Sequence, residues 1–131
     1  MLIACLVCIV AFLILDGLWL TLVARNFYQT NLGHLLAQKP NWTVAALFYI
    51  VYIAGMMIFV IVPGLQDGNL LKTLFLGAAF GFVTYATYDL TNHATMREWP
   101  YLVTIVDLAW GTALTAVVSF LSVFLSRNWS S

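Results

Sequence analysis

Charged side chains are scarce in this sequence. Asp, Glu, Lys and Arg make up 8% of its 131 residues, against about 25% in soluble domains. Hydrophobic residues make up 63%, and a core of this length cannot hide that much apolar surface from water. This excludes a water-soluble globular domain. Five basic residues balance five acidic ones, so there is no basic patch for a nucleic acid and no polybasic stretch for acidic lipids.

Cysteine is also rare, and the sequence offers few metal ligands. Cys5 and Cys8 lie three residues apart in an apolar run. Two cysteines alone are too few ligands for a zinc ion. We interpret them as buried thiols. Asp16, Asp89 and His93 are the one alternative ligand set, but we favour a plain interfacial histidine and expect no metal site. The sequence identifies no cofactor.

Long hydrophobic runs are abundant instead. Membrane-spanning helices need about 17–25 mostly apolar residues, and four windows qualify, at about residues 2–23, 44–62, 70–90 and 101–125. The sequence therefore predicts an all-α polytopic integral membrane protein, a four-transmembrane-helix bundle in which residues 1–131 form one membrane module. Turn-forming and charged residues separate the spans: Lys39-Pro40-Asn41, Pro63-Gly64 with Asp67-Gly68-Asn69, and Arg97-Glu98-Trp99-Pro100.

The only long loop runs from Arg25 to Asn41. Its apolar residues recur at helical spacing between polar ones, which suits a short helix lying in the membrane interface with its apolar side down. An ordinary ordered loop is the alternative. The basic residues are slightly more numerous on this side of the membrane, which favours both termini outside the cytoplasm.

Three aspartates interrupt the spans, where ionisable groups are costly and usually face the bundle interior. The first and third spans end at the side where the second and fourth begin. At 1.5 Å per residue, Asp16 lies ~10 Å below that surface, Asp107 ~9 Å and Asp89 only ~2 Å. We therefore expect Asp16 and Asp107 at one depth, and Asp89 near the end of its helix.

The tyrosines, tryptophans and one asparagine of the spans fall in the same leaflet, whereas the other half of the bundle is almost purely apolar. We therefore predict a half-membrane cavity with acidic groups and an aromatic lining. The alternative is that these groups bond to one another only to hold the helices together. The candidate ligand-binding residues are Asp16, Trp19, Tyr49, Tyr52, Tyr85, Tyr88, Asp89, Asn92, Asp107 and Trp110.

Two glycines of the third span, Gly77 and Gly81, form a small-xxx-small pair that lets another backbone approach closely. We predict an intramolecular contact there rather than a dimer seam. The same stripe continues to Tyr85 and Tyr88, so we expect the third span to be the central helix of the bundle.

The motifs now assembled resemble a bacterial inner-membrane family catalogued as domain of unknown function 2177. The resemblance covers nearly the whole chain and implies a multi-pass, four-span protein of the bacterial inner membrane. It implies no activity. The stretches that carry it are Leu15–Leu20, Phe27-Tyr28, Leu32–Leu36, Pro40–Trp42, Val106–Gly111 and the specific run YATYDLTN at Tyr85–Asn92.

Three functions fit these residues. The favoured one is binding or transport of a small amphipathic ligand, cationic or lipid-like, because carboxylates attract a cation and Tyr and Trp faces stabilise it. The second is an accessory subunit of a larger membrane complex or homo-oligomer, since the exterior offers lipids and other helices ample apolar surface. The third is an intramembrane enzyme that modifies lipids or peptides with paired aspartates. The catalytic residues of such an enzyme are unknown, and we favour binding over catalysis.

Overall fold

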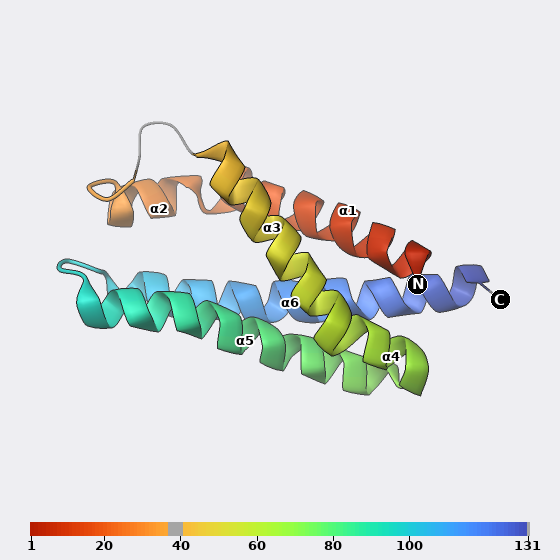
Figure 1. Cartoon of the computed structure of the whole chain (residues 1–131). Coiled ribbons are helices and arrows are strands. Elements are labelled where there is room, and N and C mark those ends of the chain that lie inside the picture. The colour runs from red at the N-terminus through yellow and green to blue at the C-terminus, as the bar shows by residue number, and fades with distance from the viewer. Residues whose placement is uncertain (37–40, 131) are drawn as a thin grey trace.

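The computed structural model describes residues 1–36 and 41–130, and every element in that part of the chain is helical. Figure 1 shows the elements in space, with both termini at one end of the molecule and α2 at the other. In chain order they are α1 (Leu2–Leu18), the π-helical turn η1 (Trp19–Val23), α2 (Arg25–Leu32), α3 (Trp42–Met56), the π-helical turn η2 (Met57–Ile61), α4 (Val62–Asp67), α5 (Leu70–Thr95) and α6 (Tyr101–Ser130).

These elements make four helices long and apolar enough to cross a membrane, which confirms the predicted all-α polytopic architecture. The candidate spans are Leu2–Val23, Trp42–Asp67, Leu70–Thr95 and Tyr101–Trp129. The second runs past its predicted end because Pro63 lies in the first turn of α4, where its missing N–H is not needed. The third continues to Thr95 because polar residues do not by themselves end a helix.

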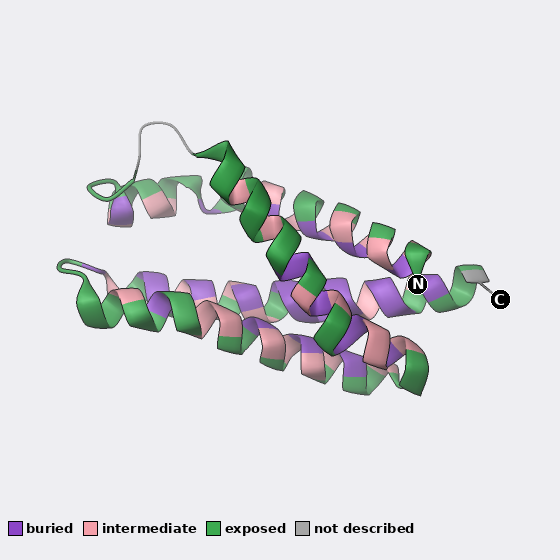
Figure 2. Cartoon of the chain, viewed as in Figure 1, coloured by how far each residue is buried: buried purple, intermediate pink, exposed green. Residues whose placement is uncertain are grey.

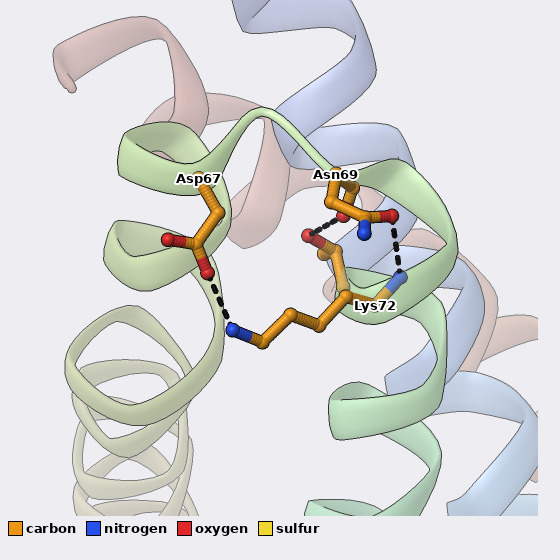
Figure 3. A network of polar contacts seen from close by, with 4 residues as sticks. Asp67, Asn69 and Lys72 are labelled. Carbon is orange, nitrogen blue, oxygen red and sulfur yellow. Dashed lines mark hydrogen bonds and ion pairs between the residues drawn. The ribbon is translucent and has the colours of Figure 1, made fainter.

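The predicted break between the second and third spans is a short turn held by side chains (Figure 3). Gly68 ends α4 in the left-handed conformation, at φ 67°. The side chain of Asn69 caps α5 by accepting a hydrogen bond from the backbone N–H of Lys72, at 3.1 Å. The ammonium group of Lys72 donates to Asp67 at 2.7 Å. Together these contacts reverse the chain direction within two residues.

The other breaks are described in part. Lys39 and Pro40, with the Pro40 end of one family motif, lie outside the described residues. Asn41 caps α3 by accepting from the backbone N–H of Val44 at 3.2 Å. The turn before α6 includes Glu98, whose φ of 60° is the only positive value among the described non-glycine residues.

The central helix is α6, so the prediction that the third span is central is wrong. In its most hydrophobic window α6 is 44% buried, against 17% for α5, because α6 packs against both α5 and α1. Figure 2 shows the buried surface concentrated along α6. The predicted contact of Gly77 and Gly81 is intramolecular, since a Cβ at either position would meet the backbone of α6.

The sequence predicts that the half of the bundle away from the aspartates is almost purely apolar, but the structure shows buried hydroxyl groups there. The buried face of α6 there carries Thr115, Ser119 and Ser122, all at 0% exposure. Ser122 donates to the carbonyl oxygen of Val118 at 2.7 Å. Small hydroxyl side chains of this kind allow close helix packing in membranes, which hydropathy patterns alone do not reveal.

The short helix predicted in the first loop is present as α2. Its Leu32 is buried together with Trp99 and Val103, and Phe27 and Tyr28 pack against this cluster. The apolar side of α2 therefore covers the start of α6. Its position at the membrane interface stays a prediction.

Candidate functional site

A pocket of about 380 Å³ lies among all four spans, near the end of the molecule that carries α2. Eight of the ten predicted residues line it, and the depth arithmetic that placed Asp16 and Asp107 at one level agrees with this arrangement. Four further residues contribute to its wall. The lining consists of Asp16, Trp19, Leu20, Tyr28, Phe48, Tyr49, Tyr52, Thr84, Tyr85, Tyr88, Asp107 and Trp110.

Asp16 is held in place by aromatic donors from two other helices. The Tyr49 hydroxyl of α3 donates to Oδ2 of Asp16 at 2.7 Å, and the Trp110 indole N–H of α6 donates to Oδ1 at 3.2 Å. The residue is 7% exposed. Each carboxyl oxygen therefore has a partner, as a buried polar group requires.

Asp107 is held in a similar way from α2. The Tyr28 hydroxyl donates to Oδ1 of Asp107 and accepts a hydrogen bond from the Trp19 indole N–H at 3.3 Å. Burial raises the pKa of the Tyr28 phenol above its ordinary value, and the hydrogen bond to Asp107 raises it further. Tyr28 therefore keeps its proton and donates a hydrogen bond to the carboxyl group.

The two aspartates are connected through tryptophans, because the tryptophan of each span contacts the aspartate of the other span directly or through Tyr28. The first and fourth spans both carry the pattern Asp-x-x-Trp, at Asp16–Trp19, where α1 passes into η1, and at Asp107–Trp110 of α6. The tryptophans stack with ring centroids 4.4 Å apart and planes 7° from parallel. Trp110 bonds directly to the aspartate of α1, whereas Trp19 reaches the aspartate of α6 through Tyr28. The indole stack and Tyr28 thus link the two carboxyl groups through a chain of contacts within one pocket.

Tyr52 fixes the floor of the pocket. It is 6% exposed, and its hydroxyl hydrogen-bonds Thr115 of α6 at 2.7 Å and Thr84 of α5 at 3.1 Å. The ring of Tyr85 packs on Gly111 so closely that a Cβ at this position would overlap it. Three spans therefore meet at these tyrosines.

The pocket carries acidic groups without basic ones. The ion pairs of the described residues are His34–Glu98 and Lys72–Asp67, and none of these four residues lines the pocket. Two carboxyl groups surrounded by aromatic rings favour a bound cation, because both attract positive charge.

Asp89 differs from its prediction. It is not near the end of a helix, since α5 continues for six residues beyond it, and it is fully buried outside the pocket lining. Its carboxyl group approaches that of Asp107, but neither oxygen has a hydrogen bond of ordinary geometry among the described residues. Asn92 also lies outside the lining, with its side chain near the hydroxyl of Tyr88, which is itself 61% exposed.

Histidine and cysteine take no part in the pocket. Thr104 hydrogen-bonds both Nδ1 of His93, at 3.3 Å, and the indole N–H of Trp99, at 3.0 Å. Cys8 is buried and Cys5 half-buried, both as free thiols. In the described part of the chain no three histidine, cysteine or acidic side chains gather closely enough to hold a metal ion.

Sequence reasoning missed Leu20, Tyr28, Phe48 and Thr84. Phe48 and Thr84 lie four residues before Tyr52 and Tyr88 and share their helix faces, so helix-face analysis could have found them. Leu20 has no distinguishing signal. The sequence places Tyr28 in the first loop, but its hydroxyl reaches Asp107, which is 79 residues away in sequence. The available signal for Tyr28 is that Phe27-Tyr28 is one of the stretches that carry the family resemblance.

No curated protein and no solved structure matches this chain. A family model does match, over residues 1–124, and it is described as a predicted membrane protein family of unknown function. The match covers both Asp-x-x-Trp helices and the whole pocket, and the chain, with four candidate spans, is a multi-pass membrane protein that belongs to the DUF2177 family.

Proposed function

We propose that this protein binds a small amphipathic organic cation in its pocket, within the inner membrane of a bacterium. The observation that carries the proposal is the lining itself. Two carboxyl groups, Asp16 and Asp107, share one pocket of about 380 Å³ with a stacked indole pair and four tyrosines of the spans. The size falls within the ordinary range of small-molecule sites.

The chemistry of the lining favours a cation over an anion or a neutral polar ligand. Aromatic faces attract cations, with the strongest effect where water is excluded. The carboxyl groups supply charge attraction, and the basic residues of the described chain lie elsewhere. An anion would meet only repulsion from these carboxyl groups.

Catalysis by paired aspartates has less support. Asp16 and Asp107 are each bonded to different aromatic donors, and the contacts between them run through the Trp19–Trp110 stack and Tyr28. Asp89 and Asp107 are the closer pair, but Asp89 lies outside the pocket lining. A substrate in the pocket would therefore meet carboxyl groups that act separately.

The test compares a cation with its neutral isostere. Benzyltrimethylammonium and neopentylbenzene have the same shape and differ only in replacing nitrogen by carbon. Tryptophan fluorescence of the purified protein in nanodiscs reports binding, because Trp19 and Trp110 line the pocket. We expect saturable binding of the cation and much weaker binding of the isostere. Equal binding of the two compounds would contradict the proposal.

Native mass spectrometry of the freshly purified protein separates binding from a role as an accessory subunit. A copurifying small molecule that disappears in the double variant Asp16→Asn/Asp107→Asn supports the proposed site. A stoichiometric protein partner in both forms, with no small molecule in either, would favour the accessory role.

A further inference from the structure

A second concavity adjoins the pocket on the side of α1 and α3. It has a volume of about 470 Å³ and is lined by aliphatic side chains, one thiol, one thioether and the ring of Tyr49. Its walls include Ile9 and Leu13 of α1 and Ala46, Ile50 and Ala54 of α3. Since α3 crosses the bundle obliquely (Figure 1), it leaves this apolar groove between itself and α1.

Tyr49 joins the groove to the acidic pocket, because it lines both. Its hydroxyl bonds Asp16 at 2.7 Å on the pocket side, while the groove continues along α1 away from Asp16. Leu13, Ile9 and Cys5 precede Asp16 by three, seven and eleven residues, so they share one helix face. At 1.5 Å per residue this wall extends ~16 Å beyond Asp16.

We propose that the ligand is a cationic amphiphile with an alkyl chain, whose head group occupies the acidic pocket and whose chain lies in the groove between α1 and α3. This inference rests on the proposed cation site and names the ligand class. The head group is selected by the two carboxyl groups. The chain is selected by an apolar wall whose hydrogen-bonding side chains are the weakly polar thiol of Cys5 and the hydroxyl of Tyr49, which is already bonded to Asp16.

A loosely associated bilayer lipid could also place an acyl chain in the groove. The two sources differ in one respect. A chain that belongs to the ligand links groove and pocket energetically, so that changes in the groove alter the affinity of the cationic head. An independent lipid chain leaves that affinity unchanged.

The test uses trimethylammonium compounds with octyl, dodecyl and hexadecyl chains, with benzyltrimethylammonium as the compound without a chain. Ala54→Phe fills the part of the groove far from Asp16. Because Ala54 is exposed in the structure, the added ring does not enter the buried core of the bundle. The matched control is Ala79→Phe, an exposed position on α5 that lines neither cavity. Binding is measured in nanodiscs of one composition, and the ratio of wild type to variant cancels partition of each compound into lipid.

We expect Ala54→Phe to weaken binding of the dodecyl and hexadecyl compounds by about tenfold, the lower end of what a methylene-sized misfit costs in an apolar site. Benzyltrimethylammonium should bind the variant as it binds wild type, and Ala79→Phe should change nothing. If benzyltrimethylammonium binds but the effect of each variant on affinity is the same for every chain length, the groove proposal is wrong and the cation site stands. If no trimethylammonium compound binds wild type, the cation site itself is wrong.

Discussion

At the scale of single residues, the pocket is built from carboxyl groups held by aromatic donors of other helices. Tyr49 and Trp110 hold Asp16, and Tyr28 holds Asp107. Interhelical hydrogen bonds in membranes contribute modestly, about 1–2 kcal/mol at most, whereas a buried carboxyl group is costly. Helix cohesion alone is therefore a weak reason to place two acids here.

Neutralising either acid separates binding from cohesion. Asp16→Asn and Asp107→Asn keep the size of the side chain and a hydrogen-bonding oxygen, and they remove its charge. We expect each to weaken benzyltrimethylammonium binding by at least about tenfold and to leave thermal stability unchanged or raised, because a costly buried acid is gone. Asp67→Asn, an exposed acid at the other end, is the control and should bind as wild type. Loss of stability with intact binding would indicate a purely structural role.

Tyr28→Phe tests the residue that sequence reasoning missed. Removing the hydroxyl breaks both the bond to Asp107 and the bond from Trp19, so the indole stack loses its link to the acid. We expect weaker cation binding and destabilisation of about 1 kcal/mol, measured by thermal unfolding. Tyr101→Phe, an exposed tyrosine at the start of α6, should have neither effect.

Tyr28 also predicts a dependence on alkaline pH. Burial and the bond to Asp107 raise the pKa of Tyr28 above its ordinary value of 10.0. Above that pH the unfolded phenol loses its proton while the folded one keeps it, so stability falls as pH rises. The fall should be smaller in Tyr28→Phe than in wild type. Parallel stability curves for the two proteins above pH 10 would show that Tyr28 is not protected.

At the scale of elements, close packing of α5 on α6 sets the position of the tyrosines. Gly111 leaves room for the ring of Tyr85, whereas Gly17 on α1 has no atom near the place of a Cβ. Gly111→Ala should therefore displace Tyr85 and destabilise the protein by about 1–3 kcal/mol. Gly17→Ala, the matched control, should be neutral or stabilising because alanine favours the helix. Similar unfolding temperatures for the two variants would contradict this packing.

The sequence predicts the number of spans well because span length and apolar composition are local properties. The turn at Asp67-Gly68-Asn69 also follows from local chemistry, through a left-handed glycine and a capping asparagine. The central place of α6 does not, because the Gly77–Gly81 pair on α5 marks a close contact without showing which helix is central. Thr115 and Ser119 of α6 permit close packing that hydropathy does not reveal. The π-helical turns at Trp19–Val23 and Met57–Ile61 depend on tertiary contacts that spacing does not encode.

Within the site, depth and spacing were enough to place Asp16, Trp19, Asp107 and Trp110 together, because antiparallel helices bring equal depths side by side. They failed for Asp89, since the depth estimate depended on a helix end that lies five residues further on than predicted.

At the scale of the whole molecule, a net charge of zero hides an uneven distribution. Two acids line the pocket, while Lys72 pairs with Asp67 and Arg127 donates to the carbonyl oxygen of Gly68 at the other end. A ligand that binds only the folded protein should stabilise it by about 2.7 kcal/mol at one hundred times its Kd. We expect benzyltrimethylammonium to raise the unfolding temperature of wild type and to leave that of Asp16→Asn/Asp107→Asn unchanged. An equal rise in both would place the effect outside the pocket.

The most direct test of the cation site is an experimental structure with 4-bromobenzyltrimethylammonium bound, in which the anomalous scattering of bromine locates the ligand. The account predicts one bromine peak inside the pocket, with the ammonium group facing Asp16 or Asp107 and the ring against the Trp19–Trp110 stack. Bromine peaks only on the outer surface of the helices, at ligand concentrations that saturate binding in solution, would contradict it.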